Sequence, residues 1–210
     1  MPTHPTHGHY EDTLANAVMF YMQKNGNPDF VFRSVNRLDR DTSGLVIIAK
    51  SQLSCAKLSR VLQEGKINKT YLALLEGSPE ADEGVIEKPI RRAGDSIITR
   101  ECCEEGQGAY ARTVYRVLKR YDGYTLVSAQ PITGRTHQLR VHFSSIGHPI
   151  VGDTLYGSAS EMLDRQALHA AMLVFPHPME DRMIRLLCPP PNDMFKWIKE
   201  YQINEILEVD

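Results

Sequence analysis

The residues best suited to chemistry lie in a short segment, 36–44, which reads Asn-Arg-Leu-Asp-Arg-Asp-Thr-Ser-Gly. Acids and arginines crowd this loop just before the apolar run 45–49, which we expect to form a buried strand. An ionised carboxylate such as Asp39 in a closed pocket needs a cationic partner, and the loop's hydroxyls and glycine can fix its backbone. The residues alone leave a second reading open, in which this is a surface turn whose aspartates cap backbone amides.

A second charged segment is 134–142, Gly-Arg-Thr-His-Gln-Leu-Arg-Val-His. We expect residues 136–143 to form a strand, which would place Arg140 on one face and Arg135 on the other. Charges close to an apolar core are costly unless they have partners. An edge strand with solvated arginines is the alternative. The following loop, 147–157, holds three glycines and reads as a structural turn, with Asp153, like Asp41, as a loop-fixing residue.

The elements that must position these segments are mostly strands. A capped helix is expected over residues 12–25, and a second between Ser51 and Gly65. Asp122-Gly123 is a good hairpin signal between two strand-like runs. The last helix begins at Asn192 or Asp193, with Trp197 among its packing residues. The expected strands are residues 45–49, 69–76, 109–119, 123–130, 136–143, 168–175 and 183–187. This pattern predicts an α+β fold with a mixed, mostly antiparallel sheet, flanking helices and a central active-site cleft.

Composition narrows the function classes only a little. The chain has 210 residues, enough for one domain, and its net charge of −2 does not by itself suggest a nucleic-acid protein. No run of 18 apolar residues occurs, so no membrane-spanning helix is expected. The four cysteines form no C-x-x-C pair, which speaks against a zinc site and favours reduced thiols in a cytoplasmic protein. We therefore expect no metal.

Four motifs, in order, resemble those of RluA-type RNA pseudouridine synthases. Residues 36–44 are similar to that family's H-R-L-D-x-x-T-S-G signature, and Lys69-x-Tyr71 to its tyrosine motif. Residues 134–142 with 147–157 resemble the third motif. Leu168-His169-Ala170 and Phe175-x-His177-Pro178 match the closing segment. Together the matches span about residues 2 to 193, and four ordered matches are far more specific than one.

The resemblance implies a cofactor-free isomerase that flips uridines out of large-subunit ribosomal RNA or tRNA and converts them to pseudouridine. Asp39 would be the catalytic aspartate, by covalent attack or by assisting a glycal-type elimination. Tyr71 would stack on the base, and Arg140 would pair with Asp39, with Arg135 as the fallback partner. The resemblance further assigns Arg37 to the gap left by the flipped base and Leu168 to packing on the uracil. A monomer that does not bind membranes is expected.

The sequence departs from the family pattern in two places. Asn36 stands where the family usually has histidine, so no acid–base role is expected there. The family strand ending in Lys-Pro-x-Gly and the small RNA-binding domain in front of it are missing. We therefore expect residues 1–210 to be an N-terminally truncated catalytic domain. These departures motivate one alternative, a catalytically inactive RNA-binding module, whereas a metal hydrolase has no supporting ligand motif.

Overall fold

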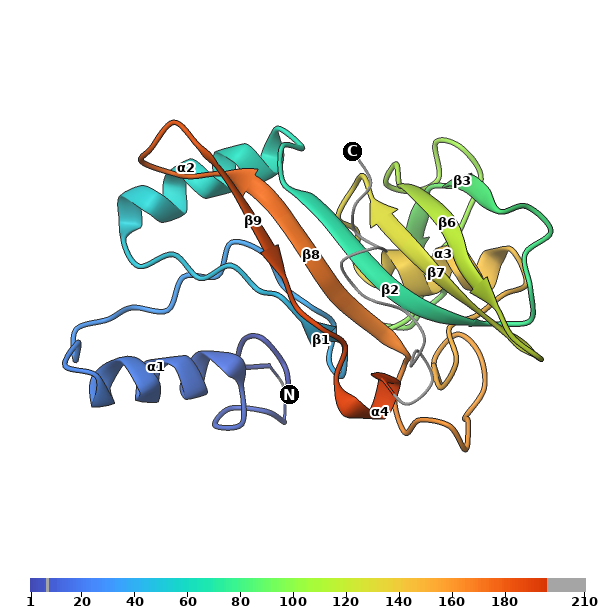
Figure 1. The fold of residues 1–210 in the computed structure, drawn as a ribbon, viewed down its shortest axis with the longest axis horizontal. Helices are drawn as coiled ribbons and strands as arrows, with labels where there is room; N and C mark the ends of the chain where they lie inside the picture. Colours follow the sequence, from blue (N-terminus) through green and yellow to red (C-terminus); the bar gives the residue numbers. More distant parts are fainter. Residues whose placement is uncertain (7, 196–210) are drawn as a thin grey trace.

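A computed structural model describes residues 1–6 and 8–195, and its centre is a mostly antiparallel sheet. The strand order is β1-β8-β2-β7-β6-β3, and β9 pairs with β8 (Figure 1). These strands are β1 (Ser43–Gly44), β2 (Asn68–Glu76), β3 (Glu83–Glu87), β6 (Arg112–Arg120), β7 (Tyr124–Pro131), β8 (Leu168–Pro176) and β9 (Met183–Leu187). Only the short β1–β8 pair is parallel in the described part of the chain. The predicted α+β class with a mostly antiparallel sheet is confirmed.

The helices lie around this sheet. They are α1 (Leu14–Lys24), α2 (Gln52–Gln63), α3 (Gln138–Ser145) and α4 (Asn192–Phe195). Of the two capping residues that the sequence offers for the first helix, Asp12 and Thr13, it is Thr13 that caps α1, and Ser51 caps α2 as predicted. A small separate hairpin joins β4 (Ile90–Arg92) to β5 (Arg100–Cys102), and α3 packs beside it and against β6 and β7. The predicted end of α4 around Trp197 lies outside the described residues.

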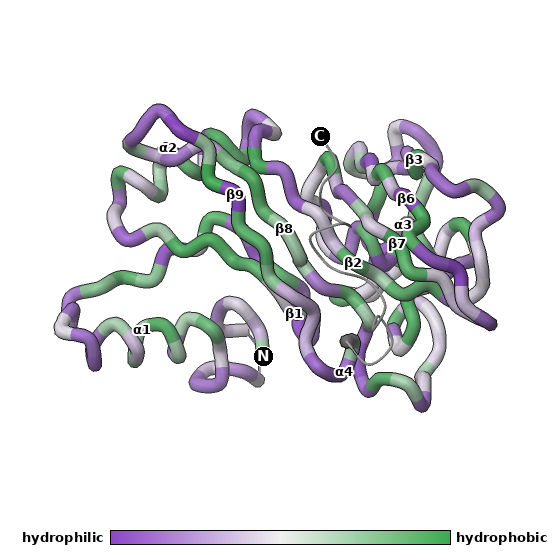
Figure 2. The backbone as a smooth tube through the Cα atoms, viewed as in Figure 1, coloured by the Kyte–Doolittle hydropathy of each residue, from purple (hydrophilic) through white to green (hydrophobic). Residues whose placement is uncertain are grey.

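The core fills both sides of β2 and β8. Leu72, Leu74 and Leu75 of β2 are fully buried, together with Phe143 of α3 and Ile150 of the loop that follows it. Figure 2 shows these central strands as largely hydrophobic, with hydrophilic residues concentrated in the connections. A smaller cluster holds α2 against the outer face of β8 through Leu58, Leu173 and Phe175. Burial on this scale is the main source of stability for such a sheet.

Residues 138–145 are helical, so the prediction of a strand over 136–143 is wrong. His137 begins the helix with a left-handed backbone, φ 56°, and the helix is buried over residues 138–143. A helix enclosed on all sides has no amphipathic stripe, and short buried runs of either type look alike in sequence. The change matters for the site, because a helix alters the direction in which Arg140 points.

The run 45–49 is not a regular strand either. Only Ser43 and Gly44 form ladder pairs, with His169 and Ala170 of β8. Beyond them, Leu45 N donates to Ala170 O, and Ser34 forms an isolated bridge with Ile48. The chain here is therefore extended, but it forms single backbone hydrogen bonds to several segments instead of a continuous ladder. The β-branched composition of the run does not distinguish these two arrangements.

Candidate active site

The loop of residues 36–44, which carries the candidate catalytic residue Asp39 and which we call the catalytic loop, is tied at its start by the side chain of Asn36. Its Oδ1 accepts a hydrogen bond from Ile47 N at 2.7 Å, and its Nδ2 donates to Leu45 O at 3.5 Å. The amide thus joins the two arms of the loop. Asn36 therefore has a structural task that an amide performs without titrating, in agreement with the expectation that it has no acid–base role.

Two residues from the segment before β8 hold the rest of the catalytic loop. Gln166 Nε2 donates to Arg40 O at 2.6 Å and to Thr42 Oγ1 at 3.1 Å. Arg165 donates to Asp41 O at 3.1 Å. Because Gln166 is buried, these hydrogen bonds exclude water and restrict the loop strongly. The sequence motifs did not single out Gln166.

The end of the loop is fixed directly on β8. Ser43 Oγ lies 2.9 Å from His169 Nδ1, and His169 Nε2 lies 2.9 Å from Cys188 O. A carbonyl can only accept, so Nε2 carries the proton and Ser43 donates to Nδ1. Gly44 has φ 116°, and a Cβ there would lie 2.3 Å from Ala170 O. Only glycine allows this close approach.

Behind the loop, a buried guanidinium connects two carboxylates. Arg140 donates through Nε and Nη2 to Asp153 at 2.6 and 2.7 Å, and its Nη1 lies 3.8 Å from Asp39 Oδ2. The side chains of Asp39, Arg140 and Asp153 are 17%, 6% and 0% exposed. The expected contact between Arg140 and Asp39 is present, but the short hydrogen bonds of Arg140 go to Asp153. Asp153 therefore does more than fix its loop: it aims the guanidinium.

The loop-fixing role predicted for Asp153 is also visible. Its Oδ1 accepts from the backbone amides of Leu155 and Tyr156, at 3.1 and 3.3 Å. Burial alone would lower the pKa of Arg140, but the hydrogen bonds and charge of Asp153, with the charge of Asp39, together raise it. The guanidinium thus stays charged beside Asp39. A buried carboxylate with this many donors is well satisfied.

The neighbouring strands supply an aromatic ring and an apolar side chain. Tyr71 of β2 and Leu168 of β8 are both buried, and the β2–β8 register shifts between Thr70 and Tyr71. Burial, followed by the negative charge of Asp39, raises the pKa of the Tyr71 phenol well above its usual range. The phenol is therefore neutral at physiological pH and able to donate a hydrogen bond.

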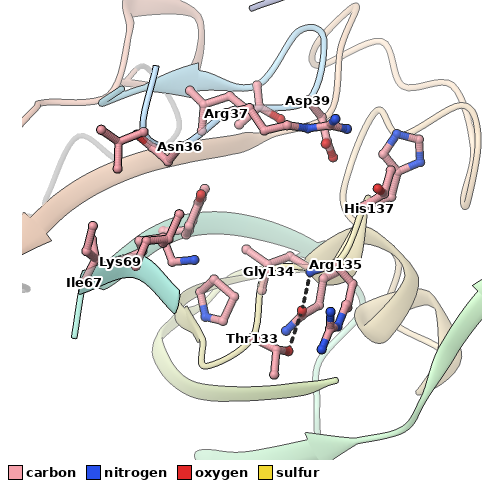
Figure 3. Close-up of a pocket in the computed structure, with 18 of the residues that line it drawn as sticks. Asn36, Arg37, Asp39, Ile67, Lys69, Thr133, Gly134, Arg135 and His137 are labelled. Atoms are coloured by element: carbon pink, nitrogen blue, oxygen red, sulfur yellow. Dashed lines mark hydrogen bonds between the residues drawn. The ribbon is translucent and has the colours of Figure 1, made fainter. Parts of the chain in front are cut away.

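These side chains border one cavity of about 730 Å³, which we call the catalytic cavity (Figure 3). Five of the six predicted site residues line it, namely Arg37, Asp39, Tyr71, Arg135 and Leu168. The sixth, Arg140, contacts Asp39 from behind. Arg37 is exposed, whereas Arg135 donates from Nε to Tyr110 O at 2.9 Å. Arg135 has no ion pair with Asp39 in the described chain, since Arg140 fills that place.

The two histidines of the third motif, His137 and His142, make structural hydrogen bonds. His142 is fully buried between Thr113 Oγ1 and Lys88 O, at 2.9 and 3.1 Å. His137 lies 2.7 Å from Tyr156 Oη while its ring borders the catalytic cavity. Burial lowers the pKa of both rings, and for His137 Asp39 partly opposes this effect.

Within the described residues, no group of three or more histidines, cysteines, aspartates or glutamates is arranged to hold a metal ion. Among the helices of the same residues, none combines the length and the apolar character that a membrane crossing requires.

Comparisons with known proteins bear on the same residues. The model of a family described as RNA pseudouridylate synthase matches residues 1–145. The uncharacterised RNA pseudouridine synthase YjbO of Bacillus subtilis is 40% identical over 93% of this chain and 68% of its own length. Ribosomal large subunit pseudouridine synthase D of Nitrosomonas europaea is 39% identical over 91% of this chain and 57% of its own length.

A solved structure supports the likeness in three dimensions. The human RNA pseudouridylate synthase domain containing 1 has a TM-score of 0.67 and 34% sequence identity, over 81% of this chain and 74% of that one. The chain spans between 57% and 68% of the length of the two bacterial relatives described above.

Proposed function

Since the chain belongs to the RNA pseudouridylate synthase family, we propose that it isomerises uridines in RNA to pseudouridine, with Asp39 as its catalytic carboxylate. In this reaction the bond between ribose C1′ and uracil N1 breaks, the base turns, and a bond forms between C1′ and C5. C5 then loses its proton and N1 gains one, so atoms and electrons balance without a co-substrate. The enzyme is thus an isomerase acting on RNA.

The position of Asp39 is the observation that carries the proposal. Its carboxylate borders the catalytic cavity, is 17% exposed and has a charged guanidinium 3.8 Å behind it. Positive charge develops at C1′ as the glycosidic bond breaks, and a preorganised carboxylate with little access to water stabilises that charge strongly. Covalent attack on C1′ and assistance of a glycal-type elimination both require this one carboxylate.

Other cavity residues have tasks that follow from their chemistry. The target base must leave its stack at a cost of about a few kcal/mol. The exposed guanidinium of Arg37 is planar and can stack in the vacated gap while hydrogen-bonding its neighbours. Tyr71 and Leu168 would enclose the uracil, and the neutral phenol of Tyr71 can move a proton. Arg135 would contact the RNA at the rim.

We propose large-subunit ribosomal RNA as the first substrate to test, with tRNA as the second. The relative from Nitrosomonas europaea carries the ribosomal large subunit in its name and is 39% identical. A ribosomal substrate would place the protein in the cytoplasm. No cofactor enters the proposed reaction.

The proposal is tested with RNA from a strain that lacks the gene. Purified protein is incubated with separated ribosomal and transfer RNA, and pseudouridine is mapped by carbodiimide labelling and reverse-transcription stops. We expect wild-type protein to form pseudouridine at defined positions. Asp39→Asn should lower the rate by at least about a thousandfold, as loss of a catalytic group commonly does.

A matched control lies two residues further along the same loop. Asp41→Asn removes a carboxylate that is 44% exposed, and asparagine tolerates its left-handed backbone, φ 69°. This variant should keep activity within about threefold of wild type, since surface changes are usually mild. Near-normal turnover by Asp39→Asn would contradict the proposal.

The alternative of a non-catalytic RNA-binding module is not favoured. A surface that only binds RNA gains nothing from a carboxylate recessed beside a buried guanidinium, because that carboxylate repels phosphate. Asp39 Oδ2 lies 3.8 Å from Arg140 Nη1, and its negative charge, after burial, helps to raise the pKa of Tyr71. This arrangement is costly to bury and agrees with catalysis rather than with binding alone.

A further inference from the structure

Lys69 is a cation that the proposed reaction does not use. It stands two residues before Tyr71 on β2, is half-buried and lines the catalytic cavity. A Cβ built on Gly134 would lie 3.7 Å from the Lys69 ammonium, so the ammonium sits beside a residue that has no side chain. Figure 3 shows its nitrogen directed into the space between the 133–135 turn and the irregular segment of residues 36–37.

No carboxylate balances this charge. Within residues 1–6 and 8–195, the Lys69 ammonium forms neither an ion pair nor a hydrogen bond. Burial lowers the pKa of Lys69, and among the described residues no neighbouring acid opposes this shift. A recessed ammonium without a counter-ion is unfavourable in a protein.

Arg140 shows how this protein otherwise treats a buried cation. Its guanidinium has a bidentate partner in Asp153 and a second carboxylate in Asp39. Lys69 lacks such a partner because it lies at the wall of the cavity, whereas Arg140 lies behind it. An unpartnered charge at the wall of a binding cavity is best explained by a ligand that brings the opposite charge.

The charges around the cavity indicate the class of that ligand. Arg37, Lys69 and Arg135 line it with a single acid, Asp39. The uracil ring and the ribose of a uridine in RNA are neutral, and the phosphodiester is its anion. We propose that Lys69 binds a backbone phosphate next to the extruded uridine, so that the nucleotide is held by its phosphate while Asp39 acts at its ribose. This inference rests on the proposed function and adds a phosphate subsite to it.

A point charge suits this task. Lysine binds phosphate through a compact ammonium on a flexible stem, without a demanding orientation. The strand also gives a fixed spacing between the phosphate subsite and the base, since Lys69 and Tyr71 belong to the same strand and border the same cavity. The 5′ and the 3′ phosphate share this chemistry, and the two isomers of uridine monophosphate distinguish them.

The test uses the 210-residue chain and three small probes: uridine, uridine 5′-monophosphate and uridine 3′-monophosphate. Binding is measured by calorimetric titration at low salt. We expect one of the two nucleotides to bind saturably and Lys69→Met to weaken it at least tenfold. The affinity for uridine should change less than twofold in Lys69→Met. Lys69→Arg keeps the charge and should therefore retain most of the wild-type affinity for the nucleotide.

Two further variants make the result specific. Lys66→Met removes a lysine just before the same strand that is 65% exposed and paired with Glu64, and it should leave nucleotide binding unchanged. Lys69→Met should unfold at the same urea concentration as wild type or a higher one, because it removes an unpaired charge. A lower midpoint would assign Lys69 a structural role and overturn the inference.

Three other results would also overturn it: no saturable binding of either nucleotide to wild type, equal losses in Lys66→Met and Lys69→Met, or a parallel loss of uridine binding in Lys69→Met. The proposed function fails separately. Asp39→Asn should bind the nucleotide at least as tightly as wild type does, because it removes a negative charge from the same cavity. An active Asp39→Asn variant would therefore refute catalysis by Asp39 while leaving the phosphate subsite intact.

Discussion

At the scale of single residues, the site depends on a row of three charged side chains, of which only Asp39 lines the cavity. Asp39 reaches the catalytic cavity, Arg140 stands behind it, and Asp153 is sealed from water. The short hydrogen bonds lie between Arg140 and Asp153. Asp153 is thus a positioning residue, because it holds the guanidinium that accompanies Asp39.

Asp153→Asn tests this arrangement. The substitution keeps the shape of the side chain but leaves a buried guanidinium without its main counter-charge, so the free energy of unfolding should fall by about 3–5 kcal/mol. Urea denaturation measures the change, with the slope unaffected. Pseudouridine formation should fall as well, since Arg140 is no longer aimed at Asp39.

Asp164→Asn is the control, because Asp164 is exposed in the same stretch of chain between α3 and β8. It should change stability by less than about 0.5 kcal/mol, as surface substitutions usually do. If Asp153→Asn unfolds at the same urea concentration as this control, the buried pair does not stabilise the fold as we describe.

At the scale of elements, the decisive contact joins the catalytic loop to β8. The loop has only two residues of regular strand, and side chains from 165–169 supply much of its remaining support. The close approach of Gly44 to Ala170 brings the backbones together there. The loop is therefore positioned by its neighbour rather than by its own secondary structure.

Gly44→Ala should disrupt this contact. A Cβ would lie 2.3 Å from Ala170 O in a backbone with φ 116°, so β1 must separate from β8. We expect a loss of at least about 3 kcal/mol, since overpacking adds about 1–3 kcal/mol to the backbone strain. Urea denaturation and the pseudouridine assay measure the two consequences.

Gly147→Ala separates strain from collision. Gly147 has φ 82°, but nothing lies within 4 Å of a Cβ built there. That variant should lose only about 1–2 kcal/mol and remain active. Equal losses at the two glycines would show that the contact between β1 and β8 has no special importance.

At the scale of the whole molecule, two buried histidines make stability depend on pH. Burial lowers the pKa of His142 and of His169 below the ordinary value of 6.5. His142 joins α3 to the sheet, and His169 joins β8 to the catalytic loop. Both rings are neutral in the fold, so they bind fewer protons there than in the unfolded chain.

The sign of the pH effect follows from this difference. Above pH 6.5 the two rings are neutral in both the folded and the unfolded chain, so the free energy of unfolding has its full value there. Below pH 6.5 the unfolded chain takes up protons first, so the free energy of unfolding falls by up to about 1.4 kcal/mol per pH unit for each histidine. The decline continues until the pH reaches the lowered pKa values of the folded state.

Urea denaturation at pH 8, 7, 6 and 5 measures this decline. His142→Gln should have a lower stability at pH 8 but a shallower fall between pH 6.5 and 5. His4→Gln, at an exposed position, controls for the loss of a histidine and should keep the wild-type slope. An unchanged slope in His142→Gln would contradict a neutral, buried His142.

The sequence by itself determined the elements whose signals are local, and the residues that belong to motifs. Thr13 and Ser51 cap their helices through neighbouring amides, and Asp122-Gly123 closes a hairpin, because these features depend on a few adjacent residues. The motifs likewise identified Asp39 and Tyr71, which do lie at one cavity.

Only the tertiary structure decided how these residues meet. It made 138–145 a helix, gave Arg140 its main partner in Asp153, and placed Gln166 on the catalytic loop. It also left Lys69 without a counter-ion at the cavity wall. Each of these outcomes depends on burial and on contacts between residues distant in sequence. A charged residue has the same local propensity and the same spacing in the sequence whether its side chain is buried with a partner or solvated. Packing of the chain decides between these two states, and with them the energetic cost of the charge.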